Sequence, residues 1–458
     1  MITTHGMKKP YSQAAQHIAQ LKTIELLINN MQLQQAAQQL TRLTVTAGHD
    51  PRLFLLGSRL AEAAGNPDGS LAAARKAHQL APEWPTATVY LAGVLASRDE
   101  VDEAMALAGK SVQGSEDAAL LIQAAAVAQR LSQFDHALQW LRQAQEITPT
   151  DVTLQHKIAR TLADSGDHSS AVAVLTELLR KNPSSPVLLV DRLRVHLKAQ
   201  QNAQAILDGE ALLVIKPDSA VYRFYLDMAR GLTPPTQPAA LVAELFDSFA
   251  LRYDRYWTGQ LHYKLPRDVA QMISEWHPDR QGDVLDLGCG TGLLGACLGP
   301  IEGVLVGVDL SGQMIAQAGR HQVYDSFHQV NLLDALQATP GNLYHVITSL
   351  DVLNYVGNLE AVIPNACRIL LPGGRFVFSF EASADEAADY TLPMTYRYTH
   401  RLGYVQRLLD EAGFKNVVIE DRVLRYEAEQ PVQGFLVTAL KQLTIEKKPA
   451  RKRLQKID

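Results

Sequence analysis

A glycine-rich loop in the second half of the chain is the segment best suited to hold a ligand. It spans residues 286–292, reads DLGCGTG, and follows the apolar residues Val284 and Leu285. Glycines at alternate positions let the chain turn tightly, and they let backbone amides approach a ligand with no β-carbon in the way. The sequence LLGACLG comes next. Its apolar residues have helical spacing, so we predict that a helix begins directly after the loop.

The charge of this loop indicates which ligand it binds. A dinucleotide fingerprint has the spacing G-x-G-x-x-G, whereas this loop has G-x-G-x-G with Asp286 two residues before Gly288. A carboxylate repels a pyrophosphate, and it attracts an ammonium or sulfonium group. The loop therefore predicts a cationic ligand and argues against a dehydrogenase.

A second acid, Asp309, ends the next apolar run, 23 residues after Asp286. An acid at this position of an α/β sheet accepts hydrogen bonds from both hydroxyls of a ribose. Asp309 can also cap a helix, and the two roles are compatible. The glycine-rich loop with its acid resembles the first motif of class I methyltransferases, which implies S-adenosyl-L-methionine as the cofactor.

The resemblance implies further residues around the cofactor. Ser311 and Met314 correspond to the wall on the adenine side. Many relatives carry an aspartate that reads the adenine amino group where this chain has Asn331; an amide oxygen can still accept that hydrogen bond, and Asp334 is the alternative if the register slips. The residues predicted to bind the cofactor are Asp286, Gly288, Gly290, Thr291, Gly292, Asp309, Leu310, Ser311, Met314, Asn331, Leu332, Leu350 and Tyr253.

Four residues are candidates for removing a proton from the methyl acceptor. Asp351 and Tyr355 follow the predicted fourth strand, and ligands of open α/β sheets bind at the carboxyl ends of the strands. Glu381 follows the fifth strand, and His400 lies in the insertion after it, which often shapes the acceptor pocket of class I enzymes. Capping by Asp351, packing of Tyr355 and a surface or capping role of His400 are the alternatives.

Alternating strands and helices position these residues. Apolar, β-rich runs occupy residues 283–288, 304–310, 345–350 and 373–380, and a third strand is expected to end near residues 328–333. This alternation predicts a mostly parallel sheet with helices on its faces, an α/β Rossmann-like domain. The last two runs, residues 416–421 and 434–440, are joined by a short link and predict an antiparallel hairpin.

The first half of the chain repeats at a fixed interval. Small residues let paired helices pack closely, a proline ends the second helix, and one unit must stack on the next to bury its apolar face. The period and order resemble the tetratricopeptide repeat, over about six repeats, and an alanine-rich helical bundle is the alternative. A small residue recurs at intervals of 34, 34, 33, 34 and 34, twelve residues before four of the prolines: Ala36, Ser70, Ala104, Ala137, Ala171 and Ala205, with Pro82, Pro149, Pro183 and Pro217.

A closer resemblance covers the whole second half. FDSFALRYDRYWTGQLHYKLP (residues 246–266), LDVLNYVGNLEAV, GGRFVFSFE and YRYTHRLGYVQRLLDEAGF resemble, in order, bacterial class I methyltransferases that carry tetratricopeptide repeats. The first of these segments places Phe246, Phe249, Tyr253 and Tyr256 on one face of a helix. The resemblance implies that this helix covers the cofactor as a lid, with Tyr253 and Asp254 toward it; core packing is the alternative.

Composition sets the wider frame. The 458 residues are 47% hydrophobic with a net charge of −5, which fits a soluble protein of two or three domains and indicates no global affinity for nucleic acid or membranes. No signal peptide or membrane-spanning run is apparent, so we expect a cytoplasmic protein. Three cysteines without a CxxC pair suggest neither a zinc site nor a disulfide framework.

We therefore predict a flexible N-terminus (residues 1–10), a tetratricopeptide-repeat array (11–231), a semi-rigid proline-rich linker (232–238), a methyltransferase domain (239–441) and a basic tail (442–458). The expected activity is direct methyl transfer from S-adenosyl-L-methionine to an acceptor, a protein or peptide recruited by the groove of the repeats. The alternatives are a small-molecule methyltransferase, and a scaffold whose methyltransferase domain senses the cofactor or is inactive.

Overall fold

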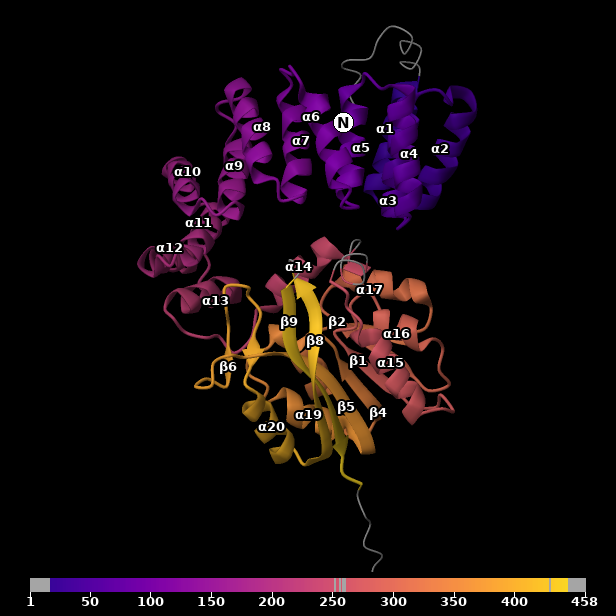
Figure 1. Cartoon of the computed structure of the whole chain (residues 1–458), viewed down its shortest axis with the longest axis vertical. Helices are drawn as coiled ribbons and strands as arrows, with labels where there is room; N and C mark the ends of the chain where they lie inside the picture. Colours follow the sequence, from indigo (N-terminus) through magenta and orange to yellow (C-terminus); the bar gives the residue numbers. More distant parts are fainter. Residues whose placement is uncertain (1–16, 251–252, 255–256, 258–260, 428–429, 444–458) are drawn as a thin grey trace, which may run out of the picture. The chain divides into compact units, whose positions relative to one another are not determined.

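The computed structural model describes residues 17–250, 253–254, 257, 261–427 and 430–443. The chain divides into two compact units, Met1–Asp218 and Ser219–Asp458. Figure 1 shows helices throughout the first unit, drawn in indigo to magenta, and a sheet in the second unit, drawn in orange and yellow. None of the helices in the described residues combines the length and the apolar character needed to cross a membrane.

The described part of the first unit is a row of helix pairs. The pairs are α1 (Ile18–Asn29) with α2 (Leu33–Ala47), α3 (Pro51–Ala63) with α4 (Pro67–Leu80), α5 (Pro85–Ala96) with α6 (Val101–Val112), α7 (Ala118–Arg130) with α8 (Phe134–Ile147), α9 (Val152–Asp164) with α10 (His168–Lys181), and α11 (Pro186–Lys198) with α12 (Asn202–Ile215).

The repeated small residues lie where the two helices of a pair meet. Ala104 of α6 and Ala92 of α5 are both fully buried, and Ser58 of α3 donates a hydrogen bond to the carbonyl oxygen of Ser70 in α4 at 2.8 Å. Four second helices, α4, α8, α10 and α12, end two residues before the repeated prolines. The repeat prediction is confirmed, and close approach of paired helices explains its period.

The second unit begins with two helices, α13 (Ala220–Ala229) and α14 (Ala239–Phe249), and continues with alternating elements. These are α15 (Leu265–Trp276), β1 (Val284–Leu287), α16 (Leu293–Leu298), β2 (Leu305–Asp309), α17 (Gly312–Ala318), η3 (Gly319–His321), β3 (Ser326–Gln329), α18 (Leu332–Ala338), β4 (Tyr344–Ser349), η4 (Leu353–Tyr355), α19 (Val362–Ile369), β5 (Leu370–Ala382), β6 (Tyr390–Thr391), β7 (Thr399–His400), α20 (Leu402–Glu411), β8 (Phe414–Glu427) and β9 (Gln430–Lys441).

These strands form one sheet in the order β3-β2-β1-β4-β5-β7-β6, and β9 pairs with both β5 and β8. Strands β1 to β5 are parallel, whereas β9 is antiparallel to its two neighbours. The predicted Rossmann-like sheet and its final hairpin are confirmed. The hairpin strands are longer than predicted, because the expected link over residues 422–433 is itself largely strand.

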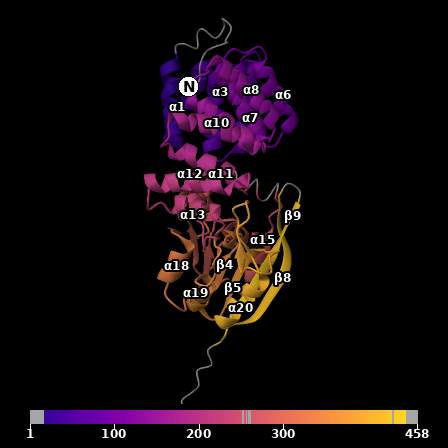
Figure 2. The same cartoon turned by 90° about the vertical axis from the view of Figure 1, so that its left-hand side faces the viewer.

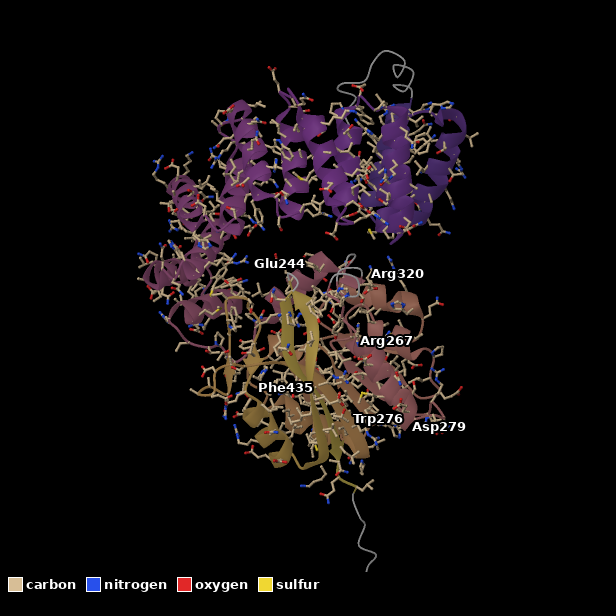
Figure 3. The ribbon with its side chains drawn as sticks, viewed as in Figure 1. Glu244, Arg267, Trp276, Asp279, Arg320 and Phe435 are labelled. Carbon is tan, nitrogen blue, oxygen red and sulfur yellow. The ribbon has the colours of Figure 1, made fainter. Side chains whose placement is uncertain are left out.

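Alternating side chains build a core on each face of the sheet. Leu285, Ile347 and Phe376 pack with α18, α19 and α20, whereas the adjacent Val284 and Val346 pack with α15 and α16. Figure 2 shows α18 and α19 on one side of β4 and β5 and α15 on the other. Arg267 and Trp276 mark α15 in Figure 3, and the Trp276 ring lies 4.6 Å from the guanidinium carbon of Arg375 on β5.

The proline-rich segment before α14 is fixed to the sheet unit. The carbonyl oxygen of Pro235 accepts hydrogen bonds from the backbone amides of Gly357 and Asn358, at 3.0 and 2.8 Å, and Thr236 forms a β-bridge with Val356. Tyr398 donates its hydroxyl hydrogen to the Pro234 carbonyl at 2.8 Å. The segment is extended, as its prolines favour. Its carbonyl oxygens accept hydrogen bonds from the second unit, so the segment is packed against that unit in addition to linking elements of the chain.

Candidate active site

A cavity that is partly open to solvent lies at the carboxyl ends of β1, β2 and β4. Its walls come from the proline-rich segment, α14, the glycine-rich loop and the turns after the strands. The lining residues are Thr236, Gln237, Val242, Phe246, Tyr253, Gly288, Gly290, Val308, Asp309, Leu310, Val330, Asn331, Leu332, Leu350, Asp351, Val352, Tyr355 and Val356.

The structure brings many of the predicted site residues to this cavity. It places Gly288, Gly290, Asp309, Leu310, Asn331, Leu332, Leu350 and Tyr253 in the lining, together with Asp351 and Tyr355. The residues that do not line it are Asp286, Thr291, Gly292, Ser311, Met314, Glu381 and His400.

Two glycines of the loop are needed for different reasons. Gly290 has φ +54° and faces open space, so a ligand can approach its backbone directly. Gly288 has φ +72°, and a β-carbon there would lie 2.2 Å from a methyl group of Val352. Gly290 therefore leaves room for a ligand, and Gly288 lets the loop pack against the turn after β4.

Asp309 joins the loop to the end of β2. One of its oxygens accepts a hydrogen bond from the amide of Gly290 and the other from the amide of Ser311, both at 2.8 Å. Burial raises the pKa of this carboxyl. A carboxylate oxygen accepts more than one hydrogen bond, so these contacts leave acceptor capacity for ligand hydroxyls.

Asp286 lies outside the cavity, which corrects the expectation that its charge faces the ligand. Tyr324 and Thr348 donate hydroxyl hydrogens to its two oxygens, at 2.7 and 2.8 Å. Because side chains alternate along β1, Asp286 shares the face of Val284, which packs with α15 and α16. Burial raises the pKa of the Asp286 carboxyl to about 6.

The other predicted cofactor residues outside the lining support the loops. Thr291 donates to the carboxylate of Asp254, and Ser311 accepts from the Met314 amide at 3.0 Å as the cap of α17. Ser311 also donates to Asp247 of α14 at 2.5 Å, which ties α14 to α17. Asp247 was missed from the sequence because its partner is 64 residues away and shares no motif with it.

Aromatic rings form one wall of the cavity. The Phe246 ring lies 5.3 Å from the Tyr355 ring and 6.3 Å from the Tyr253 ring, and Tyr253 stacks on Trp257 at 5.0 Å. Tyr256, predicted on the same helix face, lies outside the described residues. This wall joins α14 to the turn after β4, and burial raises the pKa of the Tyr355 hydroxyl.

Asp351 also lines the cavity. Its φ of +58° is unusual for a residue other than glycine, and its amide donates to the Ser379 hydroxyl at 2.8 Å. Oδ1 accepts from Nη1 of Arg425 at 2.7 Å and from Nδ2 of Asn354 at 3.1 Å, whereas Oδ2 is buried without a partner in the described residues. Burial raises the pKa of this carboxyl to about 7.

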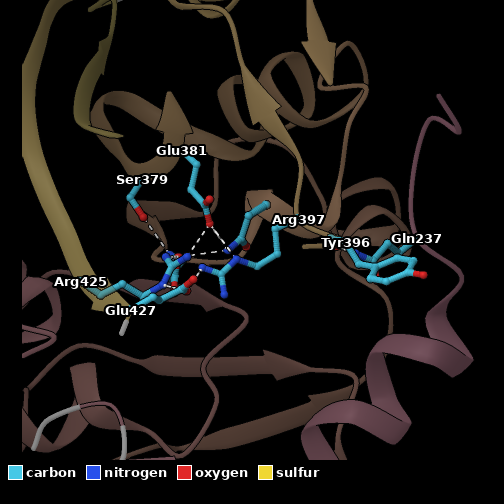
Figure 4. A network of polar contacts seen from close by, with 9 residues as sticks. Gln237, Ser379, Glu381, Tyr396, Arg397, Arg425 and Glu427 are labelled. Atoms are coloured by element: carbon cyan, nitrogen blue, oxygen red, sulfur yellow. Dashed lines mark hydrogen bonds and ion pairs between the residues drawn. The ribbon is translucent and has the colours of Figure 1, made fainter. Parts of the chain in front are cut away.

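Asp351 belongs to a charged network, by which we mean Asp351, Asn354, Glu381, Arg397, Arg425 and Glu427. Figure 4 labels four of its members, Glu381, Arg397, Arg425 and Glu427. Arg425 of β8 donates to Glu381 at 2.6 Å and to Glu427 at 2.8 Å. Arg397 donates to the same two carboxylates, at 2.9 and 2.5 Å. Arg425 was missed from the sequence because it falls in the segment interpreted as a link.

The environment of His400 does not fit its predicted role as a base. Its ring is fully buried, and Nε2 donates to the carbonyl oxygens of Val356 and Gly357, at 2.9 and 3.1 Å. Burial lowers the pKa of the imidazole to about 4. The ring packs among Phe380, Tyr390 and Tyr404, so it stabilises the turn after η4.

Comparison with known proteins agrees with this geometry. Residues 256–419 match the family described as a methyltransferase domain, and residues 7–184 match a tetratricopeptide-repeat family. The ubiquinone biosynthesis O-methyltransferase of Pseudomonas savastanoi pv. phaseolicola is 28% identical over 161 residues, which cover 32% of this chain and 69% of the relative. That of Sodalis glossinidius is 26% identical over 186 residues, covering 36% of this chain and 74% of the relative.

Two solved structures are similar to parts of the chain. Magnesium protoporphyrin IX methyltransferase from Synechocystis, with S-adenosylhomocysteine bound, covers 44% of this chain and 99% of its own, with 18% identity and a TM-score of 0.35. The repeat protein YrrB covers 42% of this chain and 98% of its own, with 19% identity and a TM-score of 0.34.

Residues 256–419 therefore belong to a methyltransferase domain, and residues 7–184 belong to a tetratricopeptide-repeat domain. The protein is an S-adenosyl-L-methionine-dependent methyltransferase that carries its repeats in front of its catalytic domain.

Proposed function

We propose that the cavity holds S-adenosyl-L-methionine and that the enzyme methylates a protein or peptide recruited by its repeats. The single observation that carries the proposal is that one cavity has two buried or half-buried acids in its lining, Asp309 with spare acceptor capacity and Asp351 with one unpaired oxygen. The first suits the ribose of the cofactor, and the second suits the reacting group.

The lining fits the parts of the cofactor. Asp309 has acceptor capacity for the ribose hydroxyls, and Gly290 lets the ligand lie close to the backbone. Leu310, Leu332 and Val330 offer an apolar slot for the adenine ring, and Asn331 lies beside them. Leu350 and Tyr253, also in the lining, then flank the part of the cofactor beyond the ribose.

The chemistry needs alignment more than covalent help. The bound cofactor supplies a methyl group on a positively charged sulfur, which an acceptor atom displaces in line. The residues of this chain must orient the acceptor, exclude water and take up a proton. Phe246, Tyr253 and Tyr355 form an apolar wall that excludes water beside Asp351.

Two observations support a macromolecular acceptor. Tetratricopeptide repeats generally bind other proteins, and here they precede the catalytic domain in one chain. The segment that follows them lines the cavity through Thr236 and Gln237. A small-molecule acceptor is the second candidate, because the relatives named above are O-methyltransferases of ubiquinone biosynthesis.

Radiolabelled cofactor distinguishes the two acceptors. The full-length enzyme is incubated with methyl-labelled S-adenosyl-L-methionine and a lysate of cells that lack it, and the products are separated by size. Label in a protein band supports the proposal, and label only in small molecules supports the second candidate. Asp309→Ala is the control that should weaken cofactor binding measured by calorimetry; unchanged binding would contradict the assignment of Asp309.

A further inference from the structure

The backbone at Asp351 is held in place from several sides. A non-glycine residue at φ +58° is strained, and such strain persists where the surroundings determine it. Here Ser379 fixes the amide, and Arg425 and Asn354 fix Oδ1. Of the two carboxylate oxygens of Asp351, only Oδ2 lacks a partner among the described residues, and Asp351 is the one member of the charged network that lines the cavity.

The charged network has one more acid than base among its described members. Its carboxyls are Asp351, Glu381 and Glu427, and its guanidiniums are Arg397 and Arg425. Arg425 is 1% exposed and spends each of its three nitrogens on a different carboxylate. A proton added to the network therefore neutralises its excess charge, and burial favours that neutral state.

The place for that proton is Asp351. Glu381 accepts from both arginines and from Asn354, and Glu427 accepts from both arginines. Asp351 accepts from only one arginine. The charged and titratable groups that face it are Arg425 and Glu427 of β8, Glu381 of β5, Arg397, Tyr355 of η4, and Tyr253 and Tyr263.

We propose that Asp351 takes the proton from the methyl acceptor, that Arg425 positions Asp351 for this step, and that the acceptor atom is an amine nitrogen or an acidic, phenol-type hydroxyl oxygen. This inference rests on the proposed function and names the substrate class for the same site. Arg425 is a positioning residue, because it lies behind Asp351 and does not line the cavity.

The step balances in atoms and charge. The acceptor lone pair forms a bond to the methyl carbon, the carbon–sulfur bond breaks, and its electron pair stays on sulfur. The acceptor hydrogen passes to Oδ2 of Asp351, so the carboxylate becomes neutral as the sulfonium charge disappears. A carboxyl with a pKa of about 7 exchanges protons well with a phenol and with the ammonium that an amine becomes as its nitrogen bonds to the methyl carbon, since both have pKa values near 10, and poorly with more weakly acidic alcohols.

Proton binding at Asp351 can be measured without any acceptor. Infrared difference spectra of cofactor-free wild type against Asp351→Asn, from pH 5 to 9, should show a protonated carboxyl that is lost near pH 7. Arg425→Lys should move this midpoint. Arg422→Lys is the control on the same strand, because the Arg422 side chain is partly exposed and pairs with Glu420, and it should leave the midpoint unchanged. A carboxyl at position 351 that is fully ionised at pH 5, or a midpoint unmoved in Arg425→Lys, would overturn the proposal.

Methyl transfer gives the second test, with the lysate acceptor described above. Asp351→Asn keeps the size of the side chain and its bond from Arg425, and should lower the transfer rate ~10²–10⁴-fold. It should also remove the wild-type rise in rate between pH 6 and 7.5, while the affinity for S-adenosylhomocysteine, which lacks the sulfonium charge, should be unchanged by calorimetry. A wild-type rate and pH profile in the Asp351→Asn variant would refute the assignment.

The methylated atom, identified by mass spectrometry, tests the substrate class. Methylation of an amine nitrogen or of a phenol oxygen would support the proposal, and the result shows which of the two acceptor types the enzyme uses. Methylation at carbon, a carboxylate or a thiol would overturn the class. If the wild-type enzyme did not bind the cofactor, the proposed function would be refuted. The infrared titration would still show whether Asp351 binds a proton near pH 7, because it is carried out without cofactor.

Discussion

Asp286 and Asp351 occupy similar positions near the carboxyl ends of parallel strands, but their surroundings differ. Both are buried, both come from the carboxyl ends of central parallel strands, and burial raises the pKa of both. Neutral hydroxyl groups of Tyr324 and Thr348 satisfy both oxygens of Asp286. Asp351 has one oxygen on Arg425 and one without a partner among the described residues.

The difference indicates that Asp286 has a structural role in the sheet, whereas Asp351 is suited to proton transfer. A buried carboxylate whose oxygens are all hydrogen-bonded has little capacity to take up a proton, whereas a buried carboxylate with an unpaired oxygen, in a residue that lines a cavity, is suited to proton exchange. The two regions touch, because Gly288 after β1 packs against Val352 after β4. Variants on either side of this contact therefore test the comparison.

The largest expected effect comes from removing the guanidinium beside Asp351. Arg425→Met leaves three buried or half-buried carboxylates without their shared partner, which should cost about 3–5 kcal/mol of unfolding free energy. Thermal unfolding of the full chain measures it, with Arg422→Met as the control on the same strand. A loss below about 1 kcal/mol would mean that the network contributes little to stability.

The pH dependence of stability should distinguish the two acids. In the unfolded chain both titrate near 3.8, and in the folded protein near 6 for Asp286 and 7 for Asp351. Between these values the folded state binds more protons than the unfolded state, so stability should fall as pH rises from about 4 to 7. A pKa difference of one between the two states corresponds to about 1.4 kcal/mol. The differences of about 2 for Asp286 and about 3 for Asp351 therefore correspond together to roughly 7 kcal/mol.

Two isosteric variants assign this pH dependence. Asp286→Asn should remove the part of the slope that ends near pH 6, and Asp351→Asn the part that extends to pH 7. The unfolding temperature at half-unit steps of pH is the measurement. A wild-type protein whose second unit becomes more stable over this range would contradict the raised values.

The contact between the two regions can be tested at its glycines. Gly290→Ala places a methyl group in open space and costs about 1–2 kcal/mol for its left-handed backbone, so its main effect should be a roughly tenfold weaker affinity for S-adenosylhomocysteine. Gly288→Ala adds a clash with Val352 to the same strain, so it should destabilise the protein more. Equal stability of the two variants would contradict this distinction.

The smallest effect is expected on the structural side. Tyr324→Phe removes the hydroxyl that donates to Asp286 and accepts from the Gly295 amide, which should cost about 1–2 kcal/mol and raise the pKa of Asp286 further. Transfer rate at saturating cofactor should stay within about twofold of wild type. A large fall in that rate would show that Asp286 takes part in the reaction after all.

Local patterns in the sequence determined most of the fold. The repeat period follows from small residues that must meet at helix contacts, and the six predicted strand runs all became strands because their apolar residues suit a buried sheet. The same patterns led to the glycine-rich loop, to Asp309 and to Asp351, since these depend on position relative to a strand end.

Only the tertiary structure decided what each acid contacts. Asp286 was predicted to face the cofactor, and the alternation of side chains on β1 turns it toward Tyr324, 38 residues away. Asp351 is hydrogen-bonded by Arg425, 74 residues away, on a strand that was predicted from the sequence to be a link between two strands. Charge, burial and the pKa of a carboxyl depend on neighbours in space, and neighbours so distant along the chain leave no local pattern to read.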